Sequence, residues 1–172
     1  YGDGLWQTDK TFYTQYWDTH LCDPDTLDVQ YIAAGTDTLP ATLAADTIYV
    51  LATGDHNMSY SMDFAWDCTA VLWKSEDINI IARVKYLPSA DSGVLFIDGN
   101  RNIIISNIEI KEQTPINANA GNPTAGVYIT NSNANTIWPW QWSNASYGIY
   151  VEWSDDISIG WSVGDNTYGH YV

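Results

Sequence analysis

Short stretches of alternating apolar and polar residues recur along the second half of the chain. Residues 144–151 (Asn-Ala-Ser-Tyr-Gly-Ile-Tyr-Val) return as residues 165–172 (Asp-Asn-Thr-Tyr-Gly-His-Tyr-Val), an offset of 21 positions. Related stretches stand at 126–129 (Gly-Val-Tyr-Ile) and 92–97 (Ser-Gly-Val-Leu-Phe-Ile). Because successive side chains of a strand point to opposite faces, each copy predicts a short β-strand.

A turn and a second apolar stretch follow the repeated strands. In three cases the last apolar residue of a strand and the first apolar residue after the turn are six positions apart. The three pairs are Leu72 and Ile78, Ile97 and Ile103, and Val151 and Ile157. Strand pairs that recur with a period of about 22 residues indicate coils that bury their apolar side chains only by stacking on one another. The sequence therefore predicts an all-β parallel β-helix, a solenoid with coils of about 22 residues. Residues 113–123 lengthen one step and are expected to form an inserted loop.

The first part of the chain lacks this repeat. We expect residues 1–47 to form an N-terminal cap region, because an open solenoid end exposes strand edges. Residues 38–45 predict a short helix in this cap, with Thr38 as N-cap and Pro40 in the first turn. Residues 48–172 should form the coils. They stop at Val172 in mid-repeat, so we expect further coils or another chain at that end.

One family resemblance rests on residues 46–51 (Asp-Thr-Ile-Tyr-Val-Leu), on the apolar strand ending in Leu72-Trp73 and on the repeats. Together, over roughly residues 46–172, they resemble the right-handed parallel β-helix superfamily, which includes pectate-lyase-like enzymes and surface proteins with short β-helix repeats. The resemblance implies a right-handed solenoid. It does not select an activity, because the superfamily holds lyases, hydrolases, epimerases and adhesins.

The amino-acid composition narrows the kinds of molecule that the protein is expected to bind. The 172 residues suit one domain, and 21 Asp and Glu against 6 Lys and Arg leave a net charge of −15. This charge argues against nucleic acid and anionic membrane surfaces, and no run of 18 apolar residues occurs to span a bilayer. Abundant Trp and Tyr with few charges favour an extracellular or cell-surface protein. Cys22 and Cys68 fit either a disulfide or two buried thiols.

Alternation also predicts which aromatic residues face outward. If Ile149 and Val151 point into the core, Tyr150 points out, and the same rule gives one outward ring per coil. Such a column can stack against sugar rings of a polysaccharide or cell-surface glycan, or its rings can stack on one another. The candidate ligand-binding residues of this column are Phe96, Tyr128, Tyr150 and Tyr171.

Acidic and basic residues supply weaker candidates. Asp155 and Asp156 lie in a turn and could hold calcium, although Asp is also an ordinary turn residue. Arg101 is the best candidate for a lyase-type base, and a surface salt bridge in its turn explains it equally well. His170 takes the place of Ile149 in its repeat and should point inward.

Several tryptophans occupy positions that suit glycine. Trp153 matches Gly99 and Asn131 in other coils, and residues 138–142 read Trp-Pro-Trp-Gln-Trp. Such turn positions accept Gly or Asn readily and bulky residues poorly. One hypothesis is that the source organism reads UGA as glycine where the sequence shows tryptophan. The other is that Trp138, Trp140 and Trp142 form an aromatic platform for carbohydrate.

These observations favour a secreted or cell-surface β-helix domain with a structural or adhesive role that binds glycans through an exposed face. The first alternative is a polysaccharide lyase or glycoside hydrolase of the pectate-lyase-like fold. The second is a purely structural stalk. We expect no cofactor, with calcium as the one candidate ion.

Overall fold

The computed structural model describes residues 22, 26–73, 82–86, 92–99, 103–106, 108–112, 124–132, 136–138, 141–143, 147–155, 157–159 and 168–171. These residues form strands and turns, with no helix among them, so the all-β prediction is confirmed. The strands are β1 (Asp28–Ile32), β2 (Gly35–Thr36), β3 (Thr47–Leu51), β4 (Gly54–Asn57), β5 (Met62–Phe64), β6 (Thr69–Trp73), β7 (Ala82–Tyr86), β8 (Ser92–Asp98), β9 (Ile104–Ser106), β10 (Glu109–Glu112), β11 (Thr124–Thr130), β12 (Thr136–Trp138), β13 (Gln141–Ser143), β14 (Tyr147–Glu152), β15 (Ser158–Ile159) and β16 (Tyr168–Tyr171).

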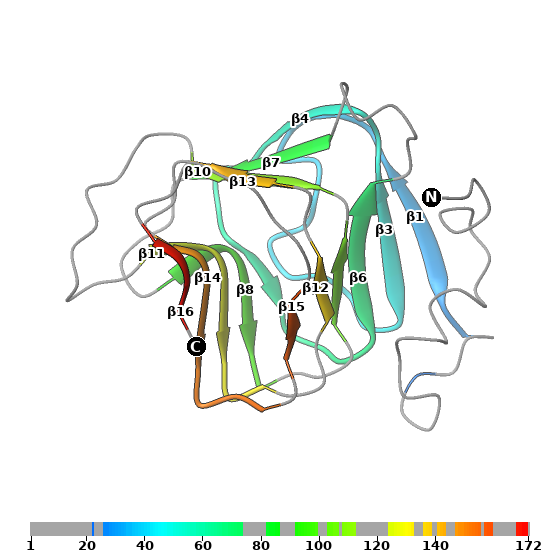
Figure 1. Cartoon of the computed structure of the whole chain (residues 1–172). Coiled ribbons are helices and arrows are strands. Elements are labelled where there is room, and N and C mark those ends of the chain that lie inside the picture. Colours follow the sequence, from blue (N-terminus) through cyan, green and yellow to red (C-terminus); the bar gives the residue numbers. More distant parts are fainter. Residues whose placement is uncertain are drawn as a thin grey trace, which may run out of the picture.

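The strands pair in three sheets (Figure 1). Sheet A has the order β1-β3-β6-β9-β12-β15, sheet B the order β2-β4-β7-β10-β13, and sheet C the order β5-β8-β11-β14-β16. Neighbouring strands are parallel in all three sheets. Along the chain, a strand of sheet A is followed by one of sheet B and one of sheet C before the next strand of sheet A, as in β3-β4-β5 and β6-β7-β8. We call each such succession of strands a pass.

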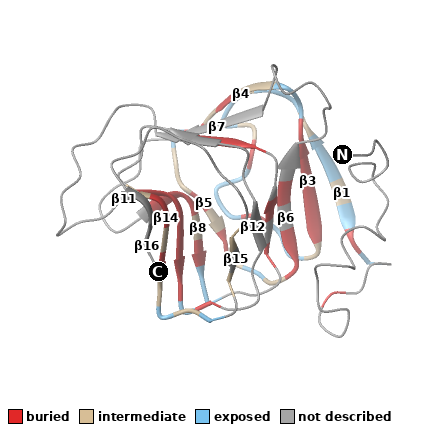
Figure 2. Cartoon of the chain, viewed as in Figure 1, coloured by how far each residue is buried: buried red, intermediate tan, exposed pale blue. Residues whose placement is uncertain are grey.

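The core lies between the three sheets, and the strand register stacks its residues in rows. In sheet C, Leu95 pairs with Val127, which pairs with Ile149. These side chains are buried, and Figure 2 shows the buried stretches side by side along β8, β11 and β14. Burying each such side chain contributes about 1.5–3 kcal/mol. A single strand cannot gain this stabilisation alone, because the apolar neighbours of its side chains belong to the preceding and following passes.

The predicted helix over residues 38–45 is wrong. Thr42 forms a parallel bridge with Asp63, and the Leu43 amide donates to the Asp63 carbonyl oxygen at 2.9 Å. The backbone thus bonds to the next pass instead of to itself. The hydroxyl of Thr38, expected to cap the helix, lies 2.9 Å from Nδ1 of His56. Leu39 and Leu43 are buried in the common core, which an extended segment achieves as well as a helix.

The sheets begin inside the segment expected to form the cap. β1 pairs with β3, and β2 pairs with β4. Most of residues 1–25 lie outside the described residues, with Cys22 as the exception. Of the two states expected for the cysteines, the disulfide is present, with 5.6 Å between the Cα atoms of Cys22 and Cys68. It ties the chain ahead of β1 to the start of β6.

The described residues include no helix long and apolar enough to cross a membrane.

Candidate functional site

A ladder of aromatic rings runs across sheet C. The strand register aligns Phe96 of β8 with Tyr128 of β11, Tyr150 of β14 and Tyr171 of β16. The ring centroids of Phe96 and Tyr128 are 5.7 Å apart, and those of Tyr128 and Tyr150 are 4.9 Å apart. For Tyr171 the backbone pairing is described and the side chain is not. Three of the four residues predicted to form the column therefore contact one another in sequence order.

Burial differs along this ladder. Tyr128 is only 5% exposed, because Phe96 and Tyr150 cover the two faces of its ring. Phe96 and Tyr150 are partly exposed. Tyr147 meets Tyr150 edge-on, with 5.2 Å between centroids and an interplanar angle of 67°. The rings do stack on one another, and among the described side chains of the ladder Phe96 and Tyr150 keep surface for a ligand.

Carboxylates border the ladder. Asp63 of β5 is aligned with Phe96, while Asp98 and Glu152 each stand two residues after a ladder residue and so share its face. The Tyr128 hydroxyl donates to Oε1 of Glu152 at 2.8 Å, and Nδ2 of Asn131 donates to Oδ1 of Asp98 at 3.0 Å. We call the set of Asp63, Phe96, Asp98, Tyr128, Tyr150 and Glu152 the outer face of sheet C.

The carboxyl group of Asp63 is affected by burial and by a neighbouring charge. Burial raises the pKa of Asp63, and the negative charge of Asp98 raises it further. Both causes act in the same direction, because burial and a nearby negative charge each disfavour the ionised form of a carboxyl group. The outer face of sheet C thus combines aromatic surface, hydrogen-bond acceptors and one carboxyl that binds its proton more tightly than usual.

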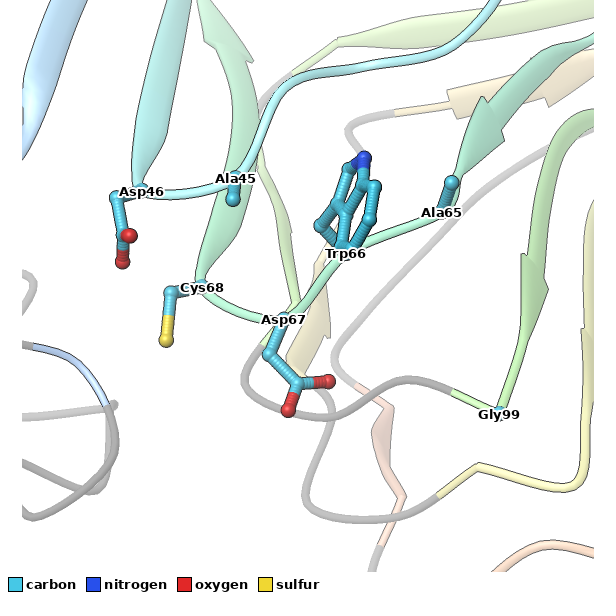
Figure 3. A pocket seen from close by; sticks show the side chains of 7 residues that line it. All are labelled: Ala45, Asp46, Ala65, Trp66, Asp67, Cys68 and Gly99. Carbon is cyan, nitrogen blue, oxygen red and sulfur yellow. The ribbon is translucent and has the colours of Figure 1, made fainter.

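A shallow hollow of about 370 Å³ lies at the corner between sheets C and A (Figure 3). Sequence reasoning did not predict a site here; the sequence signal is Trp66, an aromatic residue two positions after the end of β5. Trp66 is 56% exposed there. In Figure 3 its indole and the carboxylate of Asp67 project to opposite sides of the chain, so the two groups do not converge on one ligand. The lining residues are Ala45, Asp46, Ala65, Trp66, Asp67, Cys68 and Gly99.

The predicted tryptophan platform is divided between sheets. Trp138 ends β12 in sheet A, and Trp142 is the middle residue of β13 in sheet B. Trp138 and Trp142 therefore belong to different strands in different sheets, and their side chains are not described. Trp140 and the catalytic candidate Arg101 lie outside the described residues.

The predicted calcium site is half described. Asp155 is exposed, and its amide donates to the Ser132 carbonyl oxygen at 3.1 Å, while Asp156 lies outside the described residues. Within the described part of the chain, no group of three or more His, Cys, Asp or Glu side chains gathers to hold a metal ion. Calcium binding by this pair stays a prediction.

Two histidines lie within strands of the sheets, His56 in β4 and His170 in β16. His170 pairs with Ile149 in the strand register, in line with its place in the repeat, and its side chain is not described. His56, which the sequence did not point to, is fully buried, with Nε2 3.0 Å from the Ala52 carbonyl oxygen and Nδ1 2.9 Å from the Thr38 hydroxyl. A carbonyl oxygen only accepts, so Nε2 donates and Nδ1 accepts from Thr38. Both ring nitrogens are engaged, and His56 serves the packing of the first passes.

Comparison with models of protein families, with curated proteins and with solved structures finds no match for this chain.

Proposed function

We propose that this chain is a right-handed parallel β-helix, secreted or displayed at a cell surface, with an adhesive role in which the outer face of sheet C binds glycans. The strand order of sheets A, B and C, which recurs in β3–β5, β6–β8, β9–β11 and β12–β14, supports the β-helix. Parallel crossover connections are right-handed in nearly all proteins, which supports the hand. The resemblance of residues 46–172 to the pectate-lyase-like superfamily points the same way.

The observation that carries glycan binding is the aromatic ladder bordered by carboxylates. Sugar rings pack their C–H faces against aromatic side chains, and their hydroxyl groups donate hydrogen bonds to carboxylate oxygens. Phe96 and Tyr150 are partly exposed and supply the aromatic surface. Asp98 is exposed and Glu152 partly so, and they supply acceptors on the same face. Tyr128 holds the two outer rings at a defined spacing.

Charge selects the kind of glycan. A net charge of −15 and three carboxylates on this face oppose the approach of polyanions such as pectate. Neutral polysaccharides meet no such repulsion. The Cys22–Cys68 disulfide supports an oxidising compartment, which suits a secreted or surface-displayed protein.

The experiment is retention of the protein on neutral polysaccharides such as xylan and mannan and on acidic ones such as pectate and alginate, with and without calcium. We expect retention by a neutral polysaccharide without shortening of the polymer, and loss of this retention in Tyr150→Ala. Tyr31→Ala is the matched control, because Tyr31 is 64% exposed on the edge strand β1 of sheet A. Absence of retention on every polymer contradicts glycan binding and favours a structural stalk.

Glycoside hydrolysis is the second candidate, favoured by Asp63 and Asp98. A glycosidase uses one protonated and one ionised carboxyl across the bond that it cleaves. The raised pKa of Asp63 beside Asp98 fits the protonated partner. This function predicts shortening of the polymer, lost in Asp63→Asn. Shortening lost in Arg101→Ala while Asp63→Asn retains activity would instead indicate a lyase.

A further inference from the structure

The corner between sheets C and A repeats one backbone conformation in three successive passes. Gly99, Asn131 and Trp153 have φ angles of 74°, 50° and 51°. Each stands two residues after a buried residue of the inner row, namely Ile97, Ile129 and Val151. The residues immediately before them, Asp98, Thr130 and Glu152, are paired in register. The three residues are therefore one structural position, seen once in each pass.

Equivalent hydrogen bonds surround this position in the second and third of these passes, at Asn131 and Trp153. Oγ of Ser132 donates to the Thr130 carbonyl oxygen at 2.7 Å, and Oγ of Ser154 donates to the Glu152 carbonyl oxygen at 2.8 Å. The two turns are joined because the Ser132 amide donates to Oγ of Ser154 at 3.1 Å. These bonds are made by the groups on either side of Asn131 and Trp153, and they give the two turns the same contacts.

Tryptophan is poorly suited to such a position. Positive φ is readily adopted by Gly and tolerated by Asn and Asp, but it is an outlier for a bulky residue. Of the other described non-glycine residues with positive φ, Asp37, Asp46 and Asn131 belong to the residue types that tolerate it. The fourth, Cys68, forms a disulfide bond. The Trp153 side chain is 84% exposed, so burial does not offset the strain.

We propose that the natural protein carries glycine at position 153, encoded by a UGA codon that the source organism reads as glycine. UGA differs by one base from the tryptophan codon UGG and by one base from the glycine codon GGA. The corner column then reads glycine, asparagine and glycine in its three successive passes. The proposal is independent of glycan binding by the outer face of sheet C, which contains no tryptophan.

The direct test is to read the codon for Trp153 in the gene and to determine the mass of the peptide containing this residue from protein purified out of the source organism. We expect UGA in the gene and glycine in the peptide. A UGG codon overturns the proposal, and so does tryptophan in the native peptide.

A second test uses the thermal unfolding of variants made with the sequence as printed. Trp153→Gly and Trp153→Asn should each raise Tm by about 2–4 °C, the shift that relief of modest backbone strain produces in a domain of this size. Trp153→Ala is the matched control, because alanine removes the indole but keeps the Cβ that disfavours positive φ. A Tm for Trp153→Gly at or below that of Trp153→Ala would contradict the proposal.

Discussion

The hydroxyl of Tyr128 donates a hydrogen bond of 2.8 Å to Oε1 of Glu152, joining the central ring of the ladder on β11 to the neighbouring strand β14. The same ring lies between Phe96 and Tyr150. Tyr128 is thus held by ring contacts from two passes and by a polar contact to one of them. It organises the outer face of sheet C although it exposes almost nothing to a ligand.

Truncation of Tyr128 should therefore be costly. Tyr128→Ala is expected to lower the free energy of unfolding by about 3–5 kcal/mol, because it removes a buried ring and leaves a cavity between two others. Tyr128→Phe keeps the ring and loses one hydrogen bond, which should cost about 1 kcal/mol. Chemical denaturation of both variants measures the two values. Equal losses would show that the ring contacts contribute nothing beyond the hydroxyl.

Glycine is required at position 93 by close packing. A Cβ atom there would lie 2.6 Å from the Leu95 carbonyl oxygen and 2.8 Å from the Tyr128 amide nitrogen. Backbone atoms cannot move aside cheaply, so Gly93→Ala should destabilise the protein by about 3 kcal/mol. Gly99→Ala is the comparison, since a Cβ there meets open space and the cost is the positive φ alone, about 1 kcal/mol. Thermal unfolding should rank Gly93→Ala below Gly99→Ala, and the reverse order would refute the packing explanation.

The stability of the protein should depend on pH through Asp63. The folded state raises the pKa of Asp63, chiefly by burial and also by the charge of Asp98. Ionised Asp63 is therefore disfavoured in the folded state, so its contribution to the free energy of unfolding falls as pH rises from the unfolded pKa to the folded pKa. Asp63→Asn should be more stable than the wild type above this window and should lose that advantage below it. Unfolding midpoints across pH measure the difference.

The matched control for this charge removal is Asp28→Asn. Asp28 lies exposed on β1 and accepts a hydrogen bond from Gln30, which asparagine also allows. If both variants gain the same stability at neutral pH, the effect belongs to the overall negative charge of the protein, and the local account of Asp63 is wrong.

Loss of the disulfide should destabilise the first passes. Cys22 and Cys68 are 46 positions apart, and cross-links that close loops of this length typically contribute about 2–4 kcal/mol. The double variant Cys22→Ser, Cys68→Ser should unfold at correspondingly lower denaturant concentration. A reducing agent should shift the wild type toward this midpoint and leave the variant unchanged. An unchanged midpoint for the reduced wild type would contradict a stabilising role.

The sequence predicted sheet C well because its repeated strands are buried on one face. Leu95, Val127 and Ile149 occupy equivalent places in the repeat, and the structure pairs them. In sheet A, strand β1 was not anticipated. β1 (Asp-Val-Gln-Tyr-Ile) is largely exposed, so it lacks the apolar alternation that reveals a half-buried strand, and its pairing with β3 is settled by tertiary contacts.

The sequence predicted the aromatic residues of the candidate site, Phe96, Tyr128 and Tyr150, but neither their burial nor the carboxylates beside them. Alternation assigns Tyr128 to the outer face, but it does not reveal that Phe96 and Tyr150 cover the ring. Asp63 was missed because β5 (Met62–Phe64) is short and shares no motif with the repeated strands. The positive φ shared by Gly99, Asn131 and Trp153 could be anticipated from the residue types at the first two positions.

The most direct test of the proposed function is the dissociation constant of the neutral polysaccharide that retains the wild type, measured by affinity electrophoresis for wild type, Tyr150→Ala and Tyr31→Ala. Loss of the aromatic surface of Tyr150 should weaken binding by about tenfold, equivalent to about 1.4 kcal/mol, while Tyr31→Ala binds like the wild type. Circular dichroism establishes that both variants keep the wild-type fold. Equal binding by folded Tyr150→Ala and wild type would contradict glycan recognition by the outer face of sheet C.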